Sequence, residues 1–137
     1  MDTNTPAYSI SRSARWASYV MSGLVILFLL FDAGIKLAPL EIVTQTSAQL
    51  GLPTDAGFAR TLGVLTLVGV VLYVIPRTSV LGAILLTGYM GGAIATHLRV
   101  GSPLFSHVLL GFYLGVLIWG GLYLRDVRVR DLIPLRR

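Results

Sequence analysis

An acid and a base stand one helical turn apart at the end of a long apolar run. The run begins near Trp16, and the stretch "LLFDAGIK" places Asp32 and Lys36 at its end. Residues at i and i+4 of a helix share a face, so we expect the two side chains to pair. A charge at the bilayer centre costs about 2.5–3.5 kcal/mol, and less near the edge. Asp32 is therefore predicted to face a bundle interior, while Lys36 extends toward the lipid headgroups.

More polar side chains follow at the ends of two later apolar runs. The stretch "ATHLR" supplies a hydroxyl, an imidazole and a guanidinium, from Thr96, His97 and Arg99. Tyr89 lies seven residues before Thr96 on the same helix face. We predict one polar cluster, drawn from three helices at a single depth near the outer membrane face: Asp32, Lys36, His97, Arg99 and His107. No comparable cluster is expected in the opposite half of the bundle.

This cluster could support acid–base chemistry on a bound ligand. A carboxylate beside imidazoles can move protons. Asp32 is predicted as the base or acceptor, His97 as a proton shuttle, and Arg99 as an anchor for a carbonyl or anionic group. Ligand contacts are assigned to the remaining polar groups: Lys36, Tyr89, Thr96 and His107. The alternative is a purely structural ion pair with interfacial histidines.

Metal and cofactor sites are less favoured. His97 and His107 lie at helix ends beside a short loop, where a haem has little room. A zinc site from two histidines and an aspartate has suitable ligand types, but no local metal-binding spacing accompanies them. We therefore predict no metal site, and the sequence names no cofactor.

The composition indicates lipid as the main solvent. Of 137 residues, 55% are hydrophobic and only 12% are charged, against about 25% in soluble domains. A membrane-crossing helix needs about 20 apolar residues. Four segments meet this requirement, at about 16–38, 57–75, 79–98 and 103–124. Thr78 or Ser79 can cap the third segment, and Ser102-Pro103 the fourth. The predicted fold is an all-α, four-helix transmembrane bundle forming a single domain over residues 1–137.

The link between the first two segments is the only long one. Residues 76–78 and 99–103 are short and impose antiparallel hairpins. The long link, 39–56, carries apolar or small residues near one helical face, and Gly51 with Pro53 supply a stop. We interpret it as a short amphipathic helix on the membrane surface or over the bundle end. An ordinary structured loop is the alternative.

Arginine and lysine indicate the orientation. The two termini and the 76–78 link together hold eight of the eleven basic residues, and the other side holds Lys36, Arg60 and Arg99. The positive-inside rule then places both termini in the cytoplasm. We expect a multi-pass protein of the cell (cytoplasmic) membrane. An aromatic belt is predicted near the cytoplasmic ends, from Trp16, Tyr19, Tyr73, Trp119 and Tyr123. The first apolar stretch is too long for a cleaved signal peptide.

Several function classes lose support. The chain has no cysteine, which excludes disulfides and thiol chemistry of its own. It has no nucleophile-elbow, phosphate-binding or nucleotide-binding motif. The basic tail "RDVRVRDLIPLRR" is interpreted as a solvated positive-inside tail, so nucleic acid is not expected as a partner. Two G-x-x-x-G pairs, Gly88 with Gly92 and Gly111 with Gly115, favour close packing within the bundle, with a dimer face as the alternative.

The chain resembles the DoxX-like family of small four-helix membrane proteins. Three stretches carry this resemblance: "FLLFDAGIKL", "LGVLTLVGVVLYVIPRTSVLGAILLTGYMGGAIATHLRVG" and "HVLLGFYLGVLIWGGLYLRD". The resemblance covers nearly the whole chain from about Trp16. It implies the four-helix fold and traffic with quinones, because some relatives are named for quinone-linked thiosulfate oxidation. It transfers no catalytic residues, and the lack of cysteine argues against direct sulfur chemistry here.

The function expected from these features is binding or transforming a lipophilic small molecule of quinone or isoprenoid type. The alternative is a non-enzymatic partner subunit or assembly factor, associating through the glycine faces with another membrane protein or as a homo-oligomer. A small transporter is less favoured, because broken helices and paired inverted halves are absent from the sequence pattern. The lipid bilayer is the partner in every case, and whether the chain is an enzyme stays open.

Overall fold

The structure, a computed structural model, describes residues 9–38 and 40–135. Two long helices follow each other along the first half of the chain, α1 (Arg12–Leu37) and α3 (Ala56–Val74). The side chain of Ser11 accepts a hydrogen bond from the amide of Ala14 and begins α1, and Asp55 does the same for α3 through Phe58. These caps satisfy amides that would otherwise lack partners.

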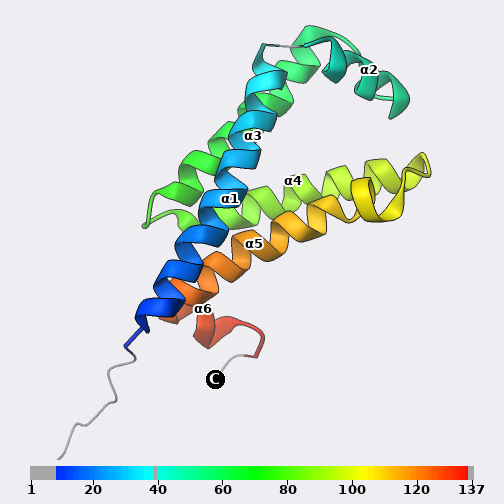
Figure 1. Cartoon of the computed structure of the whole chain (residues 1–137). Helices are drawn as coiled ribbons and strands as arrows, with labels where there is room; N and C mark the ends of the chain where they lie inside the picture. The colour runs from blue at the N-terminus through cyan, green and yellow to red at the C-terminus, as the bar shows by residue number, and fades with distance from the viewer. Residues whose placement is uncertain (1–8, 39, 136–137) are drawn as a thin grey trace, which may run out of the picture.

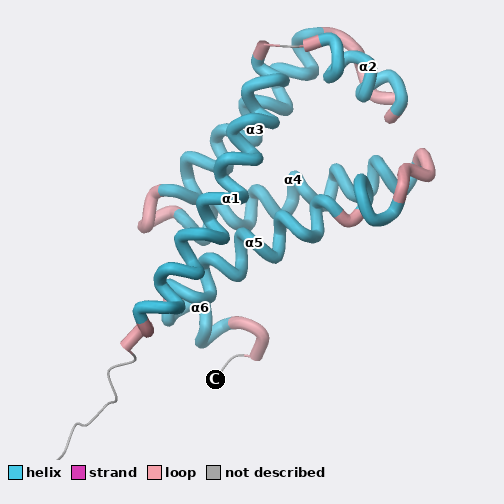
Figure 2. The backbone as a smooth tube through the Cα atoms, in the orientation of Figure 1, coloured by secondary structure: helices cyan, strands magenta, loops and turns pink. Residues whose placement is uncertain are grey.

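The second half of the chain continues with α4 (Ser79–Arg99), the π-helix η1 (Leu104–Val108), α5 (Leu110–Arg125) and α6 (Val127–Leu132). Four helical stretches are long and apolar enough to cross a membrane: 12–37, 56–74, 79–99 and 104–125. The predicted all-α fold with four such helices is confirmed, and the described residues hold no strand (Figure 2). The orientation of the termini stays a prediction.

The boundaries differ in two informative places. The first helix begins at Arg12, one turn before the predicted start, because Ser11 caps it there. The fourth begins with a π-helix, in which the carbonyl of Pro103 accepts from the amides of both His107 and Val108. Ser102 does not cap this helix, and its hydroxyl instead bonds to the ring of His97.

The long link forms the predicted short helix, α2 (Glu41–Gln49). Val43 and Ser47 are buried on one face, as an amphipathic pattern requires. Gly51 then adopts a φ of 64°, a left-handed conformation that glycine tolerates at a helix C-terminus. The expectation of an amphipathic helix in this link is confirmed.

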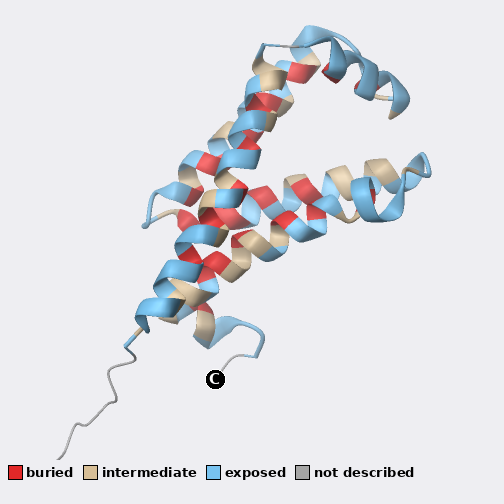
Figure 3. Ribbon diagram, viewed as in Figure 1, coloured by how far each residue is buried: buried red, intermediate tan, exposed pale blue. Residues whose placement is uncertain are grey.

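The four long helices form a ring in which α1 contacts α3 and α5, and α4 contacts the same two helices. Toward the end that carries α2, α1 and α3 lean away from α4 and α5 (Figure 1). We call this the α2 end, and the opposite end, where α1 begins and α6 lies, the terminal end. Buried residues follow the contacts between neighbouring helices, while outward faces are exposed (Figure 3).

Helix contacts are closest at the terminal end. A Cβ built on Gly82 of α4 would lie 2.3 Å from the amide nitrogen of Tyr73 on α3, so the two backbones touch. The predicted close packing also holds at Gly111, where a Cβ would lie 3.1 Å from the carbonyl oxygen of Met90. It is wrong at Gly88, Gly92 and Gly115, which have no neighbour within 4 Å of the same position.

A buried hydroxyl network lies at the terminal end, where no such cluster was expected. The phenol of Tyr73 donates to the carbonyl of Ile118 at 2.9 Å and lies 2.9 Å from the hydroxyl of Ser22. Arg125 donates to the same serine hydroxyl at 2.8 Å. Tyr73 is 1% exposed, so its assignment to a membrane-surface aromatic belt is wrong. A phenol this deep requires hydrogen-bond partners, and this network supplies them.

The basic tail is partly built into the fold. Val129 of α6 packs into the core. Arg130 donates to the carbonyls of Tyr123 and Leu124, both at 2.6 Å, and so caps the end of α5. A cation at a helix C-terminus also interacts favourably with the helix dipole. The interpretation of this segment as only a solvated tail is therefore wrong for α6.

Candidate functional site

A pocket of about 540 Å³ lies where the two helix pairs diverge. Its walls come from α1, α3, α4, η1 and α5, and α2 contributes the buried Val43 and Ser47. Ligand pockets in proteins typically measure about 300–1,000 Å³ and combine an apolar lining with few polar groups. The polar groups in this lining are side chains of Asp32, Lys36, Thr46, Ser47, Tyr89, Thr96, His97 and His107.

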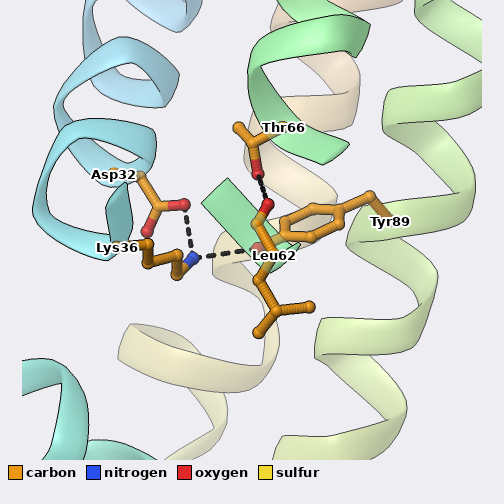
Figure 4. A network of polar contacts seen from close by, with 5 residues as sticks. All are labelled: Asp32, Lys36, Leu62, Thr66 and Tyr89. Carbon is orange, nitrogen blue, oxygen red and sulfur yellow. Dashed lines mark hydrogen bonds and ion pairs between the residues drawn. The ribbon is translucent and has the colours of Figure 1, made fainter. Parts of the chain in front are cut away.

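Lys36 links two helices across this pocket. Its Nζ lies 2.5 Å from a carboxylate oxygen of Asp32 on α1 and donates to the phenol oxygen of Tyr89 on α4 at 2.9 Å (Figure 4). The side chains of Lys36 and Asp32 are 17% and 24% exposed, respectively. The predicted i, i+4 pair is confirmed, and the pair has no net charge. A neutralised pair is the form in which ionisable groups are tolerated within a membrane.

This arrangement leaves hydrogen-bonding capacity for a ligand. An ammonium group has three N–H donors, and the described residues take up two of those of Lys36. The phenol of Tyr89 accepts from Lys36, and its own O–H has no acceptor among the described residues. The carboxylate of Asp32 keeps free lone pairs. The site can therefore donate two hydrogen bonds and accept others.

The histidines lie at a second polar position in the same pocket. His97 ends α4 and His107 lies in η1, and their ring centroids are 5.6 Å apart. The Nδ1 of His97 lies 3.0 Å from the hydroxyl of Ser102, and that of His107 lies 2.7 Å from Ser106. Sequence reasoning placed both histidines at one level, and the structure brings them together.

The two polar positions are not one cluster. Lys36 contacts Tyr89, which precedes His97 by eight residues on α4, a rise of about 12 Å. No hydrogen bond or ion pair joins Asp32 to either histidine within the described residues. The predicted cluster is therefore divided into two positions within one pocket, because α4 leans away from α1 toward the α2 end (Figure 1).

Arg99 and Thr96 take different places from those expected. The guanidinium of Arg99 donates to the carbonyl of Leu50 at the end of α2, and Arg99 does not line the pocket. It thereby connects α2 to the end of α4. Thr96 lines the pocket, but its hydroxyl donates to the carbonyl of Gly92 one turn earlier at 2.8 Å.

Sequence reasoning missed the residues that create the space. Gly88 and Gly92 line the pocket, and neither has a neighbouring atom within 4 Å of a built Cβ. Their G-x-x-x-G spacing is typical of helix packing, whereas here both glycines face open space. Phe28 of α1 and Leu110 of α5 also line the pocket, although 39% and 37% of their surfaces stay exposed. Both side chains therefore combine a place in the pocket lining with partly accessible surface.

The fold and this site define a multi-pass membrane protein whose helices enclose a largely apolar pocket with two polar positions. The model of the DoxX-like family matches residues 20–121, and the chain belongs to that family. In comparisons with curated proteins and with solved structures, no protein of either kind matches the chain.

Proposed function

We propose that the protein binds a lipophilic small molecule of quinone or isoprenoid type in the pocket at its α2 end. The observation that carries this proposal is one pocket of about 540 Å³, mostly apolar, into which the Lys36–Tyr89 bridge projects unused donors. A volume of this size accommodates a drug-sized molecule. An apolar pocket within a membrane protein suits a ligand that already dissolves in lipid.

The polar end of the ligand would bind at Asp32, Lys36 and Tyr89. A quinone carbonyl can accept from the ammonium of Lys36 and the phenol of Tyr89, and a quinol or isoprenoid hydroxyl can donate to the carboxylate of Asp32. Because the ion pair is neutral, an uncharged head is favoured over a phosphate. Asp32 keeps its role as acceptor or base from the sequence analysis, while Arg99 acts on α2 and does not anchor the head.

The apolar part of the ligand would enter between α1 and α5. Phe28 and Leu110 line the pocket on these two helices and are partly exposed, and both lie in spans long and apolar enough to cross a membrane. A ligand could then pass from the bilayer into the pocket without crossing water. Under the positive-inside rule the basic residues favour cytoplasmic termini, and in that orientation this pocket would lie in the outer half of the membrane.

Identification of co-purifying molecules tests the proposal. Protein purified in mild detergent is analysed by native mass spectrometry, and the bound material is extracted and identified. We expect one non-phospholipid molecule per chain. Gly92→Leu should displace it by filling the pocket, because Gly92 lines open space there.

Gly91→Leu is the matched control. Gly91 is exposed, has open space around its Cβ position and is not part of the pocket. This variant should retain the molecule. Loss in both variants, or bulk phospholipid alone in the unmodified protein, would contradict the proposal. A second protein released by Gly91→Leu would instead support the partner-subunit alternative.

A further inference from the structure

We propose that His97 and His107 form a binding site for a late first-row divalent transition metal ion, with copper(II) bound most tightly. The two imidazoles come from different elements, α4 and η1, and their ring centroids are 5.6 Å apart. This inference is independent of the ligand proposed for the pocket. It also departs from the sequence analysis, which predicted no metal site.

The ring separation fits one shared ion. Imidazole nitrogens bind such ions at about 2.0–2.1 Å, so two rings on one ion in a bent arrangement have centroids about 5–6 Å apart. The observed separation lies within this range, and the interplanar angle of 60° keeps the rings from stacking face to face. The two rings are therefore already at about the separation that a shared ion requires.

Each imidazole is oriented by a serine. The hydroxyls of Ser102 and Ser106 lie 3.0 and 2.7 Å from the Nδ1 atoms of His97 and His107. A hydroxyl that accepts from Nδ1–H leaves a lone pair on Nε2, the form of histidine that binds metals. Such outer partners are typical of metal-binding histidines. In both rings the remaining nitrogen is therefore the one available to an ion.

The π-helix places His107 in this position. The carbonyl of Pro103 accepts from the amides of His107 and Val108, which adds a residue to the first turn of the fourth span. π-Helical turns are rare and occur frequently at functional sites. In a continuous α-helix each residue turns about 100° from the last, so the widened turn changes the direction of His107 relative to His97.

The type of donor atom, two imidazole nitrogens, decides which metal ion binds most tightly. No third histidine, cysteine, aspartate or glutamate joins the pair among the described residues, so water would complete the coordination. Two neutral imidazoles favour copper(II) over nickel(II) and zinc(II) in the general order of affinities, and they bind magnesium and calcium poorly. His107 is exposed and His97 partly so, which gives an aqueous ion access.

Copper(II) titration of tag-free protein in lipid nanodiscs tests the site. The chain has two histidines and no cysteine, so imidazole couplings in an electron paramagnetic resonance spectrum come from these rings alone. We expect one copper(II) per chain coupled to two imidazole nitrogens. His97→Gln should leave one coupled nitrogen and lower the affinity more than about tenfold. Ser106→Ala, which removes only an orienting partner, should lower it by about tenfold.

Three results would overturn the inference: no binding of copper(II), coupling to a single imidazole nitrogen in the unmodified protein, or equal affinity after His97→Gln. Thr61→Ala is a control for surface effects, because its exposed hydroxyl bonds only to its own helix, and it should bind as the unmodified protein does. The nitrogen count is taken on the unmodified protein, so the test does not depend on whether a variant folds.

Discussion

The ammonium of Lys36 on α1 donates to the phenol oxygen of Tyr89 on α4 over 2.9 Å, although the two residues are 53 positions apart. In the described part of the chain this is the one hydrogen bond between these two helices. They are diagonal partners in the ring and otherwise barely touch. The bond therefore crosses the pocket and helps to define its width.

Removing one member of the ion pair should destabilise the protein more than removing both. Asp32→Asn leaves the Lys36 cation within the membrane without its counter-charge. Lys36→Met likewise leaves the Asp32 carboxylate without a cation. Each single change should lower the free energy of unfolding by about 2 kcal/mol, and the double variant should lower it by less than either single change does. Unfolding in mixed SDS and mild-detergent micelles measures this cycle, and strict additivity would count against coupling.

Tyr89→Phe should weaken ligand binding while the fold is retained. The change removes one pocket donor and the acceptor for Lys36, and a hydrogen bond to a charged group contributes about 1.5–3 kcal/mol. We expect ligand retention to fall by at least about tenfold, measured by quantifying co-purified material. Tyr113→Phe is the control, since Tyr113 is exposed on α5; equal losses in both variants would refute a specific role.

Gly82→Ala should be poorly tolerated. A Cβ at this position would lie 2.3 Å from the backbone nitrogen of Tyr73, which cannot move aside as a side chain could. We expect the free energy of unfolding to fall by at least about 2 kcal/mol. Gly91→Ala has open space around it and should raise stability by up to about 1 kcal/mol through helix propensity. Unchanged stability of Gly82→Ala would show that the two backbones are not in contact.

Arg99→Met should free the end of α2. The guanidinium donates to the carbonyl of Leu50, and α2 otherwise has few contacts with the long helices. Hydrogen–deuterium exchange should accelerate over 46–52 and stay the same in α3. Arg60→Met provides the control, because Arg60 lies at the same end but donates to Leu37. Equal exchange of α2 in both variants would exclude the proposed tether.

Tyr73→Phe should reveal the strength of the hydroxyl network at the terminal end. The change leaves the hydroxyl of Ser22 and the carbonyl of Ile118 without the phenol, at a cost of about 1–3 kcal/mol for buried groups. Chemical unfolding measures the loss. Tyr19→Phe is the matched control, because Tyr19 is 57% exposed, and its stability should stay within about 0.5 kcal/mol of the unmodified protein.

The long helices were predictable because their apolar runs are long and end at strong stop signals such as Pro76. The ion pair was predictable from the spacing of Asp32 and Lys36 alone. Both features depend on local sequence, where periodicity and capping carry the information. The amphipathic α2 was recognisable for the same reason.

The angle between the helix pairs was not predictable, because it depends on where distant backbones touch. A glycine pattern marks small residues but does not say whether they face another helix or a space, so Gly92 was misinterpreted. The buried hydroxyls escaped notice because serine and tyrosine carry no charge that would mark them as costly. The π-helix was missed because one added residue leaves the apolar pattern nearly unchanged.

The backbone contact between Gly82 and Tyr73 fixes α4 close to its N-terminus, at the terminal end, so a rigid rotation of α4 about this contact moves its C-terminus most. His97 lies about 22 Å from Gly82 along the axis of α4, at about 1.5 Å of rise per residue. A rotation of α4 by about 10° about the contact at Gly82 would shift its C-terminal end by about 4 Å, given this length of the helix. A displacement of less than an ångström beside Gly82 would become a shift of several ångströms at the histidines if α4 and α5 moved together, since α4 also packs on α5 at Met90.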